Sequence, residues 1–369
     1  MSKALIAMSG GVDSSVAALL TKQSGYECVG ATMRLFDNSD IGLTREHTCC
    51  SLDDVEDARS VAFSLGIPYY VFNFSDRLKK DVIDRFIYAY EHGWTPNPCI
   101  DCNRFLKFDK FYTRAMEIGC DYVVTGHYAV IEKPNADCDR YTLKRPTDRL
   151  KDQTYVLYSM TQEQLAHTLF PLGRTDKQET RKIAEQYGFI NAAKHDSQDI
   201  CFVQNGSYAD FIEEYTGKHY PQGNFVDKSG RILGRHNGII RYTVGQRKGL
   251  GISSERPLYV CSVDPVKNEV CLGGNEDLFT DTVYAEDVNF ISIPKLDGHI
   301  RVTAAVRYHG RELPADVYPT EKGIKLIFDS PQRAVTAGQA VVMYDGETVV
   351  GGGTIVHTEN SYIKTDNTQ

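Results

Sequence analysis

A chain of 369 residues is long enough for two or three folded domains, and 41% hydrophobic with 24% charged residues is an ordinary composition for a folded protein. No apolar run approaches the length of a membrane span, and the N-terminus carries no signal-peptide pattern, so we expect a cytoplasmic protein with no membrane partner. The net charge of −8 does not by itself suggest a nucleic-acid partner, although the local distribution of charge decides where a polyanion binds.

A strand, a glycine turn and a helix are predicted within residues 1–15. Ala4–Met8 is apolar, as in a short buried strand, Ser9–Gly11 turns the chain, and a helix opens at Val12. Open backbone N–H groups, the positive end of the helix and serine hydroxyls allow this loop to hold a phosphate. The loop lacks the lysine of the common phosphate-binding motif and carries Asp13, whose charge a Mg2+ ion could reconcile with phosphate. The alternative is an ordinary glycine turn in which Asp13 and the serines only cap the helix.

The string S-G-G-x-D-S-S, from Ser9 to Ser15, resembles the loop of the ATP pyrophosphatase (PP-loop) superfamily. Members of that superfamily grip the pyrophosphate of ATP and transfer AMP to an oxygen of their substrate. The resemblance implies that this loop binds ATP, with Mg2+ as the accompanying ion.

Strands and helices alternate along the first part of the chain. Further strands are predicted at Glu27–Phe36, Tyr69–Phe74 and Asp121–His127, and helices at about residues 51–65, 76–91 and 103–118. This alternation predicts an α/β fold with a parallel sheet and helices on both of its faces. Ligands bind beyond the carboxyl ends of such strands, so the turn at Ser9, Met33 and Gly126 should share one site, with Met33 against the adenine. Core packing is the alternative for Met33.

Ten cysteines in a cytoplasmic chain favour thiol chemistry, metal binding or burial over a disulfide framework. Cys99 and Cys102 form the only C-x-x-C pair, and a structural zinc site is disfavoured because the chain has no second pair and no H-x3-5-H pattern. Cys102 is expected at the start of the helix predicted over residues 103–118. Cys201 stands in a polar, non-periodic stretch, which favours an exposed reactive loop over a buried thiol.

The character of the chain changes twice after residue 205. Residues 152–188 look helical, whereas short strands and glycine turns follow one helix, Tyr208–Thr216, up to Gly274. From Asp277 onward the chain is strand-like throughout, which suggests a small barrel. We therefore expect a PP-loop catalytic domain at residues 1–205, a small, mixed, basic central domain at 206–276 and a C-terminal β-barrel at 277–369.

Two clusters of basic residues interrupt this acidic chain. The first holds Arg140, Lys144, Arg145, Arg149 and Lys151; the second lies between Ser229 and Ser254, where no acid occurs, and holds Arg231, Arg235, Arg241, Arg247 and Lys248. Either cluster alone could be a solvated loop, but together they favour an electrostatic footprint for a polyanion.

Further strings, met in order along the chain, make the resemblance more specific. Together with the loop and the total length, they resemble the family of bacterial tRNA-specific 2-thiouridylases. They are Asn97-Pro98-Cys99 with Cys102-Asn103, Lys107-Phe108, Thr125-Gly126-His127-Tyr128, Lys151-Asp152-Gln153 and Asp196-Ser197-Gln198-Asp199-Ile200-Cys201-Phe202.

This resemblance implies ATP-dependent 2-thiolation of the wobble uridine of tRNA. The uridine O2 would attack the α-phosphorus of ATP, which releases pyrophosphate and turns the carbonyl oxygen into a good leaving group. Cys201 would carry a persulfide from an upstream sulfur-relay donor protein and deliver sulfur to C2, while Cys102 attacks the persulfide and AMP departs. ATP would be bound by Ala7, Met8, Ser9, Gly10, Gly11, Val12, Asp13 and Ser14, with Met33 and Gly126 near the adenosine.

The resemblance also implies a set of tRNA contacts, in addition to a tRNA-contacting central domain. They are Asn97, Pro98 and Cys99 around the target base, His127, Lys151, Asp152 and Gln153, and in the barrel Arg307, Tyr308 and Gln339. Some family members carry aspartate at the position of Cys99, so a proton-transfer role is not expected for this thiol. Cys99, Cys102 and Cys201 could instead hold an iron–sulfur cluster, which is the less favoured alternative.

Three rival interpretations stay open. A PP-loop ligase that activates a carboxylate would need no paired thiols. A redox-regulated RNA-binding module would hold ATP without releasing pyrophosphate. An enzyme that thiolates another tRNA position would form 4-thiouridine or 2-thiocytidine.

Overall fold

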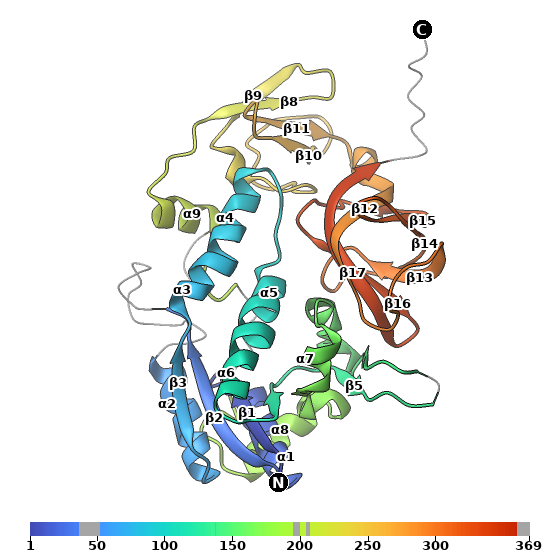
Figure 1. Ribbon diagram of the computed structural model, residues 1–369. Coiled ribbons are helices and arrows are strands. Elements are labelled where there is room, and N and C mark those ends of the chain that lie inside the picture. The colour runs from blue at the N-terminus through green and yellow to red at the C-terminus, as the bar shows by residue number, and fades with distance from the viewer. Residues whose placement is uncertain (37–51, 137, 195–199, 204–206, 360–369) are drawn as a thin grey trace.

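A computed structural model describes residues 1–36, 52–136, 138–194, 200–203 and 207–359 and arranges them in three sheets (Figure 1). The first is a five-stranded sheet in the order β3-β2-β1-β4-β7. Its strands are β1 (Lys3–Ala7), β2 (Glu27–Arg34), β3 (Tyr69–Asn73), β4 (Tyr122–Val124) and β7 (Thr168–Leu169). All of their pairings are parallel, which confirms the predicted α/β fold. The short edge strand β7 was not foreseen, because residues 152–188 look helical in sequence.

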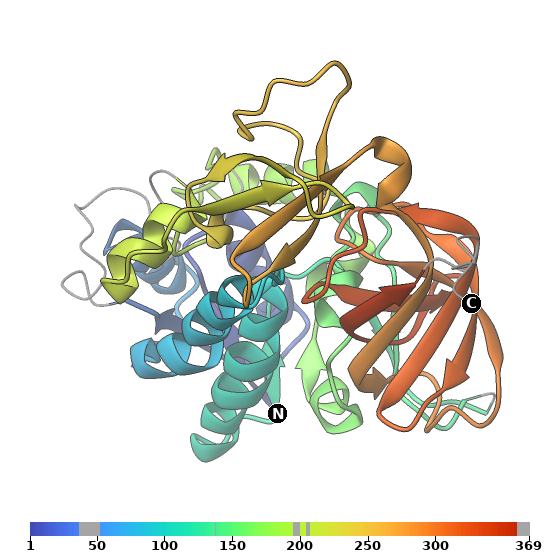
Figure 2. The same ribbon diagram turned by 90° about the horizontal axis from the view of Figure 1, so that it is seen from above.

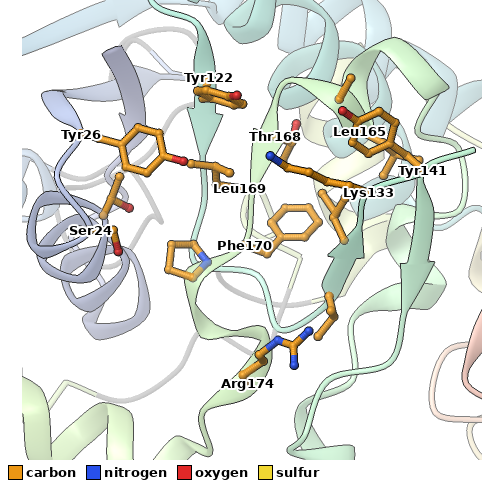
Figure 3. A pocket seen from close by; sticks show the side chains of 15 residues that line it. Ser24, Tyr26, Tyr122, Lys133, Tyr141, Leu165, Thr168, Leu169, Phe170 and Arg174 are labelled. Atoms are coloured by element: carbon orange, nitrogen blue, oxygen red, sulfur yellow. The ribbon is translucent and has the colours of Figure 1, made fainter. Parts of the chain in front are cut away.

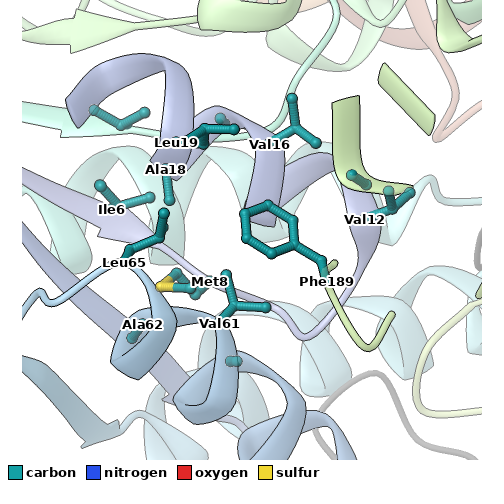
Figure 4. Close-up of a cluster of buried hydrophobic side chains, with 14 of the residues drawn as sticks. Ile6, Met8, Val12, Val16, Ala18, Leu19, Val61, Ala62, Leu65 and Phe189 are labelled. Atoms are coloured by element: carbon teal, nitrogen blue, oxygen red, sulfur yellow. The ribbon is translucent and has the colours of Figure 1, made fainter. Parts of the chain in front are cut away.

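Both faces of this sheet are covered by helices. Side chains alternate across β1, so Ile6 joins one hydrophobic cluster and Leu5 joins another. On the Ile6 side lie α1 (Val12–Gln23), α2 (Leu52–Ser64) and α8 (Lys177–Gln186), and Figure 4 shows the side chains that pack there. On the Leu5 side, Phe111 and Ala115 belong to a helix that runs from Pro98 to Glu117.

Two long helices of this layer combine several windings. The first comprises α3 (Ser75–Leu78), a wider π-type stretch at Lys79–Ile83 and α4 (Asp84–Glu91). The second comprises α5 (Pro98–Asp101), a π-type stretch at Cys102–Phe111 and α6 (Tyr112–Glu117). The expectation that a helix starts near Cys102 is therefore wrong. Pro98 takes the first helical position, and the Asn97 side chain accepts a hydrogen bond from the Cys99 N–H (3.1 Å), so the helix begins a full turn earlier.

Shorter elements connect this layer to the rest of the molecule. They are the helical turns Arg149–Lys151, Thr154–Leu157 and Pro171–Arg174, the helix α7 (Gln162–Ala166), and the strands β5 (Val130–Glu132) and β6 (Thr142–Lys144). The hairpin of β5 and β6 was not predicted. It extends the barrel sheet, because Lys144 of β6 pairs with Thr348 of β17.

A second sheet follows the helix α9 (Tyr208–Thr216), which lies where it was predicted. Its order is β10-β11-β8-β9, formed by Gly223–Val226 (β8), Ile232–His236 (β9), Tyr259–Asp264 (β10) and Glu269–Gly273 (β11). A helical turn at Ile239–Arg241 lies between β9 and β10. Phe225 and Ile240 share a buried cluster with Phe86 of α4, so this sheet packs on the helical layer, and Figure 2 shows it over the top of the molecule.

The last part of the chain closes into an antiparallel barrel, as predicted. Its strands follow the order β12-β15-β14-β13-β16-β17, and a pairing between β12 and β17 closes the ring. They are β12 (Phe279–Phe290), β13 (Ile300–Ala305), β14 (Leu313–Pro319), β15 (Gly323–Arg333), β16 (Ala340–Asp345) and β17 (Thr348–Glu359), with the helical turn Asn275–Leu278 before them. Within the described ranges, no helix combines the length and apolar character that a bilayer crossing requires.

Candidate active site

The loop after β1 is shaped by a glycine that no other residue can replace. Gly10 has φ +76°, and a Cβ at this position would collide with the backbone carbonyl of Asp54 in α2. The Asn191 side chain donates hydrogen bonds to the Gly10 carbonyl and to Ser15 Oγ, both at 2.9 Å. The loop is therefore held from two sides, by α2 and by the segment after α8.

The serine hydroxyls of the loop have different hydrogen-bonding roles. Ser14 Oγ and Ser15 Oγ donate to the Gly11 carbonyl at 2.9 and 3.1 Å, and both side chains are buried. Ser9 is exposed, and its N–H donates to Ser14 Oγ at 3.2 Å. Of the predicted hydroxyl donors, Ser9 is thus the exposed one, with its Oγ donating to Ser14 Oγ at 3.3 Å, whereas Ser14 and Ser15 keep the loop in shape.

A lysine does reach the loop, but from a distant part of the chain. Lys177, the first residue of α8, places its Nζ at 2.7 and 2.8 Å from the two carboxylate oxygens of Asp13. The Tyr128 hydroxyl donates to Asp13 Oδ1 at 2.9 Å. Sequence reasoning quoted Tyr128 in one of the strings but gave it no role, and it missed Lys177, which lies 164 positions from Asp13 and carries no local signal of its own.

The end of β4 lies against the start of α1. A Cβ at Gly126 would come within 2.8 Å of the Ser14 nitrogen, so a glycine is required for this approach. The chain leaves β1 toward β2 on one side, while β4 lies on the other side, so this is the point at which strand order switches. Met33, at the end of β2, is partly buried and packs against two hydrophobic clusters, as in the alternative of core packing.

Cys102 and Cys201 pack against the same large hydrophobic cluster although they are distant in sequence. Both side chains are partly buried and pack against the cluster that contains Phe86, Leu106 and Phe202. Cys201 is therefore less exposed than a reactive loop residue was expected to be. The preceding residues of the string, Asp196–Asp199, lie outside the described residues.

The expected tRNA contacts from three chain segments converge between the helical layer and the barrel. Gln339 Nε2 donates to the carbonyls of Thr95 (2.7 Å) and Pro96 (3.2 Å), directly before Asn97. The Tyr308 hydroxyl donates to the Asp152 carbonyl at 3.5 Å. Burial raises the pKa of Tyr308 to about 12, and the negative charges of Asp152 and Cys99 add to this shift, so Cys99 lies in the same group. Arg307 is exposed beside it.

Some members of the predicted tRNA-contacting set make contacts within the protein. The His127 ring is 8% exposed, lies 2.7 Å from Thr125 Oγ1 and 3.5 Å from Lys107 Nζ, and has a pKa well below its usual value because of burial and then the Lys107 charge. Gln153 Oε1 accepts a hydrogen bond from the Tyr128 N–H at 2.9 Å. Pro98 is buried at the start of its helix. Lys151 is partly exposed, in a helical turn next to Asp152.

Comparisons with known proteins match the chain over nearly its whole length. Family models match three successive regions: a tRNA methyl transferase HUP domain at residues 2–205, a tRNA methyl transferase PRC-barrel domain at 209–274 and an aminomethyltransferase beta-barrel domain at 280–355. A protein of Clostridioides difficile called tRNA-specific 2-thiouridylase MnmA is 52% identical over 354 residues, which is 96% of this chain and 98% of the relative. The chain belongs to the MnmA family. Proteins of the same name from Acetivibrio thermocellus and Clostridium beijerinckii are each 51% identical and share 96% of this chain, with 99% and 98% of their own lengths covered.

Five of the ten basic residues predicted to form a footprint form ion pairs with acidic residues of this MnmA-family chain. The pairs join Arg145 to Asp152 and Glu312, Arg149 to Glu347, Lys144 to Glu132, Arg231 to Asp227, and Arg241 to Asp210 and Glu213. Arg247 and Lys248 differ: both are exposed, and the described part of the chain records no ion pair for either. Fewer of these positive charges are therefore available to a polyanion than the sequence suggested.

A pocket of about 330 Å3 lies elsewhere in the MnmA-family fold, beside the edge strand β7 (Figure 3). Tyr26, Tyr122 and Tyr141 line it together with Lys133 and Arg174. None of the predicted ATP, thiol or tRNA residues lines this pocket, so it is separate from the candidate active site. No group of three or more metal-ligating side chains able to hold a metal ion occurs among the described residues.

Proposed function

We propose that the protein is an ATP-dependent tRNA-uridine 2-sulfurtransferase that replaces O2 of the wobble uridine by sulfur. The observation that carries the proposal is the near-complete match to relatives named for this activity, at about 50% identity over 96% of the chain. The local geometry agrees with it, because one chain combines an anion-binding loop, two thiols on one hydrophobic cluster and a gathering of polar side chains beside the barrel.

The loop from Ala7 to Ser14 binds the triphosphate of ATP in this proposal. The fit is supported by Gly10 and Gly126, where backbone comes so close to neighbouring chain that a Cβ has no room, and by the exposed Ser9. Asp13 would supply a carboxylate oxygen to a Mg2+ ion, which would offset the negative charge of the phosphates. Lys177 balances the charge of Asp13 and adds a cation beside the phosphates.

Adenylation activates the base for substitution. The uridine O2 attacks the α-phosphorus, the bond to the β-phosphate oxygen breaks, and pyrophosphate leaves. The Lys177 ammonium group stabilises the negative charge on the leaving pyrophosphate. This interaction is only partly screened by solvent, because the Lys177 side chain is only 12% exposed. The carbonyl oxygen then leaves with AMP instead of as a poorer leaving group.

Sulfur reaches C2 from a persulfide on Cys201. If the terminal sulfur attacks C2 directly, AMP leaves and the Cys102 thiolate then cleaves the S–S bond at Cys201 Sγ, which forms a Cys102–Cys201 disulfide. If Cys102 attacks Cys201 Sγ first, the same disulfide forms and the released hydrosulfide attacks C2. Either route ends with a disulfide that a two-electron dithiol reductant must reduce. Packing of both thiols against one cluster supports this pairing.

The remaining roles follow the same proposal. The tRNA is contacted by Asn97–Cys99, Lys151–Gln153, Arg307, Tyr308 and Gln339. The buried His127 supports this surface. The catalytic domain comprises residues 1–205, the central domain residues 206–276 and the barrel domain residues 277–369. The protein acts in the cytoplasm, and a persulfide-relay protein is its sulfur donor. We favour thiol chemistry at Cys102 and Cys201 over an iron–sulfur cluster on Cys99, Cys102 and Cys201, because thiol–disulfide exchange needs only the two thiols.

Nucleoside mass spectrometry tests the function. The protein, ATP, Mg2+, a persulfide donor and unmodified tRNA should yield 2-thiouridine together with AMP and pyrophosphate. Cys201→Ser and Cys102→Ser should abolish 2-thiouridine but retain pyrophosphate release, since adenylation needs no thiol. Formation of 4-thiouridine or 2-thiocytidine would overturn the assignment. Full activity of Cys201→Ser would favour a ligase that activates a carboxylate.

A further inference from the structure

Three exposed aromatic side chains gather where α4 ends. Tyr88 is 53% exposed and Trp94 36%, and His92 is also exposed. The rings of Tyr88 and His92 are stacked, with centroids 3.8 Å apart and an interplanar angle of 26°. Trp94 stands against both, with its ring centroid 6.3 Å from each. Large aromatic groups left at the surface as a cluster typically mark an interaction site.

This aromatic platform, formed by Tyr88, His92 and Trp94, is held in place before any partner binds. His92 Nδ1 lies 2.7 Å from the Tyr88 carbonyl, and the Trp94 N–H donates to the Ala89 carbonyl at 2.8 Å. On the barrel side, Gly338 leaves room for Trp94, since a Cβ there would lie 3.1 Å from Trp94 Cβ. A partner that stacks on these rings would therefore pay little ordering entropy.

The platform continues directly into the segment proposed to surround the target base. Thr95 follows Trp94; its N–H donates to the Ala337 carbonyl at 2.8 Å and its carbonyl accepts from Gln339. Thr95 Oγ1 also donates to Thr243 Oγ1 at 3.4 Å. The helical layer, the barrel and the central sheet thus meet at one residue, and the platform stands at the edge of that junction.

Exposed basic residues follow Thr243, the residue whose side chain contacts Thr95. Arg247 and Lys248, exposed and without a recorded ion pair among the described residues, follow Thr243 on the segment that touches Thr95. The nearest acid on α4, Glu91, is bound by Lys218 and Tyr220 at 2.6 and 2.7 Å. Exposed aromatic faces are a means by which proteins hold unpaired nucleotides, since every base has a face that stacks.

We propose that Tyr88, His92 and Trp94 form a stacking platform for unpaired bases of the RNA substrate that flank the target uridine. This inference rests on the proposed function and adds a binding site to it. A flanking base stacked on Trp94 is fixed one residue away from the Thr95–Pro96 segment that Gln339 holds. Stacking of this base therefore fixes which neighbouring base reaches Asn97–Cys99, and it holds the bases of the RNA loop apart.

Trp94 is the only tryptophan of the chain, so its fluorescence reports on this site alone. Titration of the full-length protein with an anticodon stem-loop RNA should quench the emission, whereas a blunt RNA duplex at equal nucleotide concentration should not. Trp94→Ala should weaken stem-loop binding on the order of tenfold, measured by filter binding, and Trp94→Phe should restore most of it. Phe63→Ala, which removes an aromatic ring 86% exposed on α2, is the matched control and should bind as wild type.

Several outcomes would overturn the platform. They are equal affinity of Trp94→Ala and wild type for the stem-loop, equal quenching by duplex and stem-loop, and normal RNA affinity of Trp94→Ala with a specific loss of sulfur uptake from a donor protein. The last outcome would make the platform a protein interface. Failure of the function itself is distinguishable: wild type would then form no 2-thiouridine, while the fluorescence titration would still report whether unpaired RNA stacks on Trp94.

Discussion

Replacement of Lys177 by methionine removes the cation that balances Asp13 at the proposed ATP loop. The Lys177 and Asp13 side chains are 12% and 30% exposed, and their charged atoms lie 2.7 Å apart. Exposed ion pairs couple by about 0.2–1 kcal/mol, and loss of one partner from a fully buried pair costs about 3–5 kcal/mol. The partial burial of this pair places the expected coupling at about 1–3 kcal/mol, since solvent screens it only in part.

A double-mutant cycle measures this coupling. Urea denaturation of wild type, Lys177→Met, Asp13→Asn and the double variant should give single-variant losses that sum to more than the loss of the double variant. The Tyr128 hydroxyl, 2.9 Å from Asp13, does not replace the lost cation because it carries no charge. Lys182→Met changes an exposed lysine of the same helix and should leave stability near that of wild type.

The same variants separate a structural role from a role in ATP binding. Lys177→Met removes the cation proposed to lie beside the phosphates, so ATP-dependent pyrophosphate release should fall, and it should fall further in the double variant, which also lacks the carboxylate proposed as a Mg2+ ligand. A coupling within about 0.5 kcal/mol of zero would refute the reasoning, because independent sites add to that precision. So would pyrophosphate release in Lys177→Met that equals that of Lys182→Met.

Three further predictions concern other parts of the molecule. Gln339→Ala removes two hydrogen bonds to the Thr95–Pro96 segment and should raise KM for tRNA severalfold with KM for ATP unchanged; a parallel rise in both would contradict a tRNA-specific role. Burial raises the pKa of Asp101 to about 6 despite the positive charge of Arg85, so the folded state holds this proton more tightly and stability should fall as pH rises from about 4 to 6. The free energy of unfolding of Asp101→Asn should not decrease over this pH range, and at pH 8 it should exceed that of wild type by up to about 3 kcal/mol, measured by urea denaturation. An unchanged decrease in the variant would show that another group titrates. Burial, then the neighbouring Cys271, raises the pKa of Cys261 to about 12, so iodoacetamide at pH 8 should label the exposed Cys99 far faster than Cys261 in peptide mass spectrometry; equal rates would contradict this.

Local sequence was sufficient where neighbouring residues supply the decisive interactions. The helix Tyr208–Thr216 lies where it was predicted, because Ser207 caps its start and Gly217, at φ +64°, ends it. The strand, turn and helix of the first loop follow from the apolar run, the glycines and the spacing of the serines. Alternating strands and helices were enough to predict the parallel sheet.

Local reasoning failed where a residue had two plausible roles. Cys102 was expected at the start of its helix, yet Asn97 caps this helix and Pro98 is its first residue, so Cys102 lies a turn inside it. The two-residue strand β7 carries no periodicity of its own and exists because β4 offers it a partner. The hairpin of β5 and β6 likewise depends on the open edge of β17 in the distant barrel.

The sequence by itself determined the local elements of this protein and the residue types that its chemistry needs: a glycine loop, an acid within it and two thiols. Only the tertiary structure decided what those residues face. Lys177 meets Asp13, Gln339 holds Thr95, and Cys201 joins Cys102 on one cluster, across separations that no spacing rule covers. The physical reason is that capping and periodicity act between near neighbours, whereas these contacts arise from the packing of whole elements on shared hydrophobic clusters.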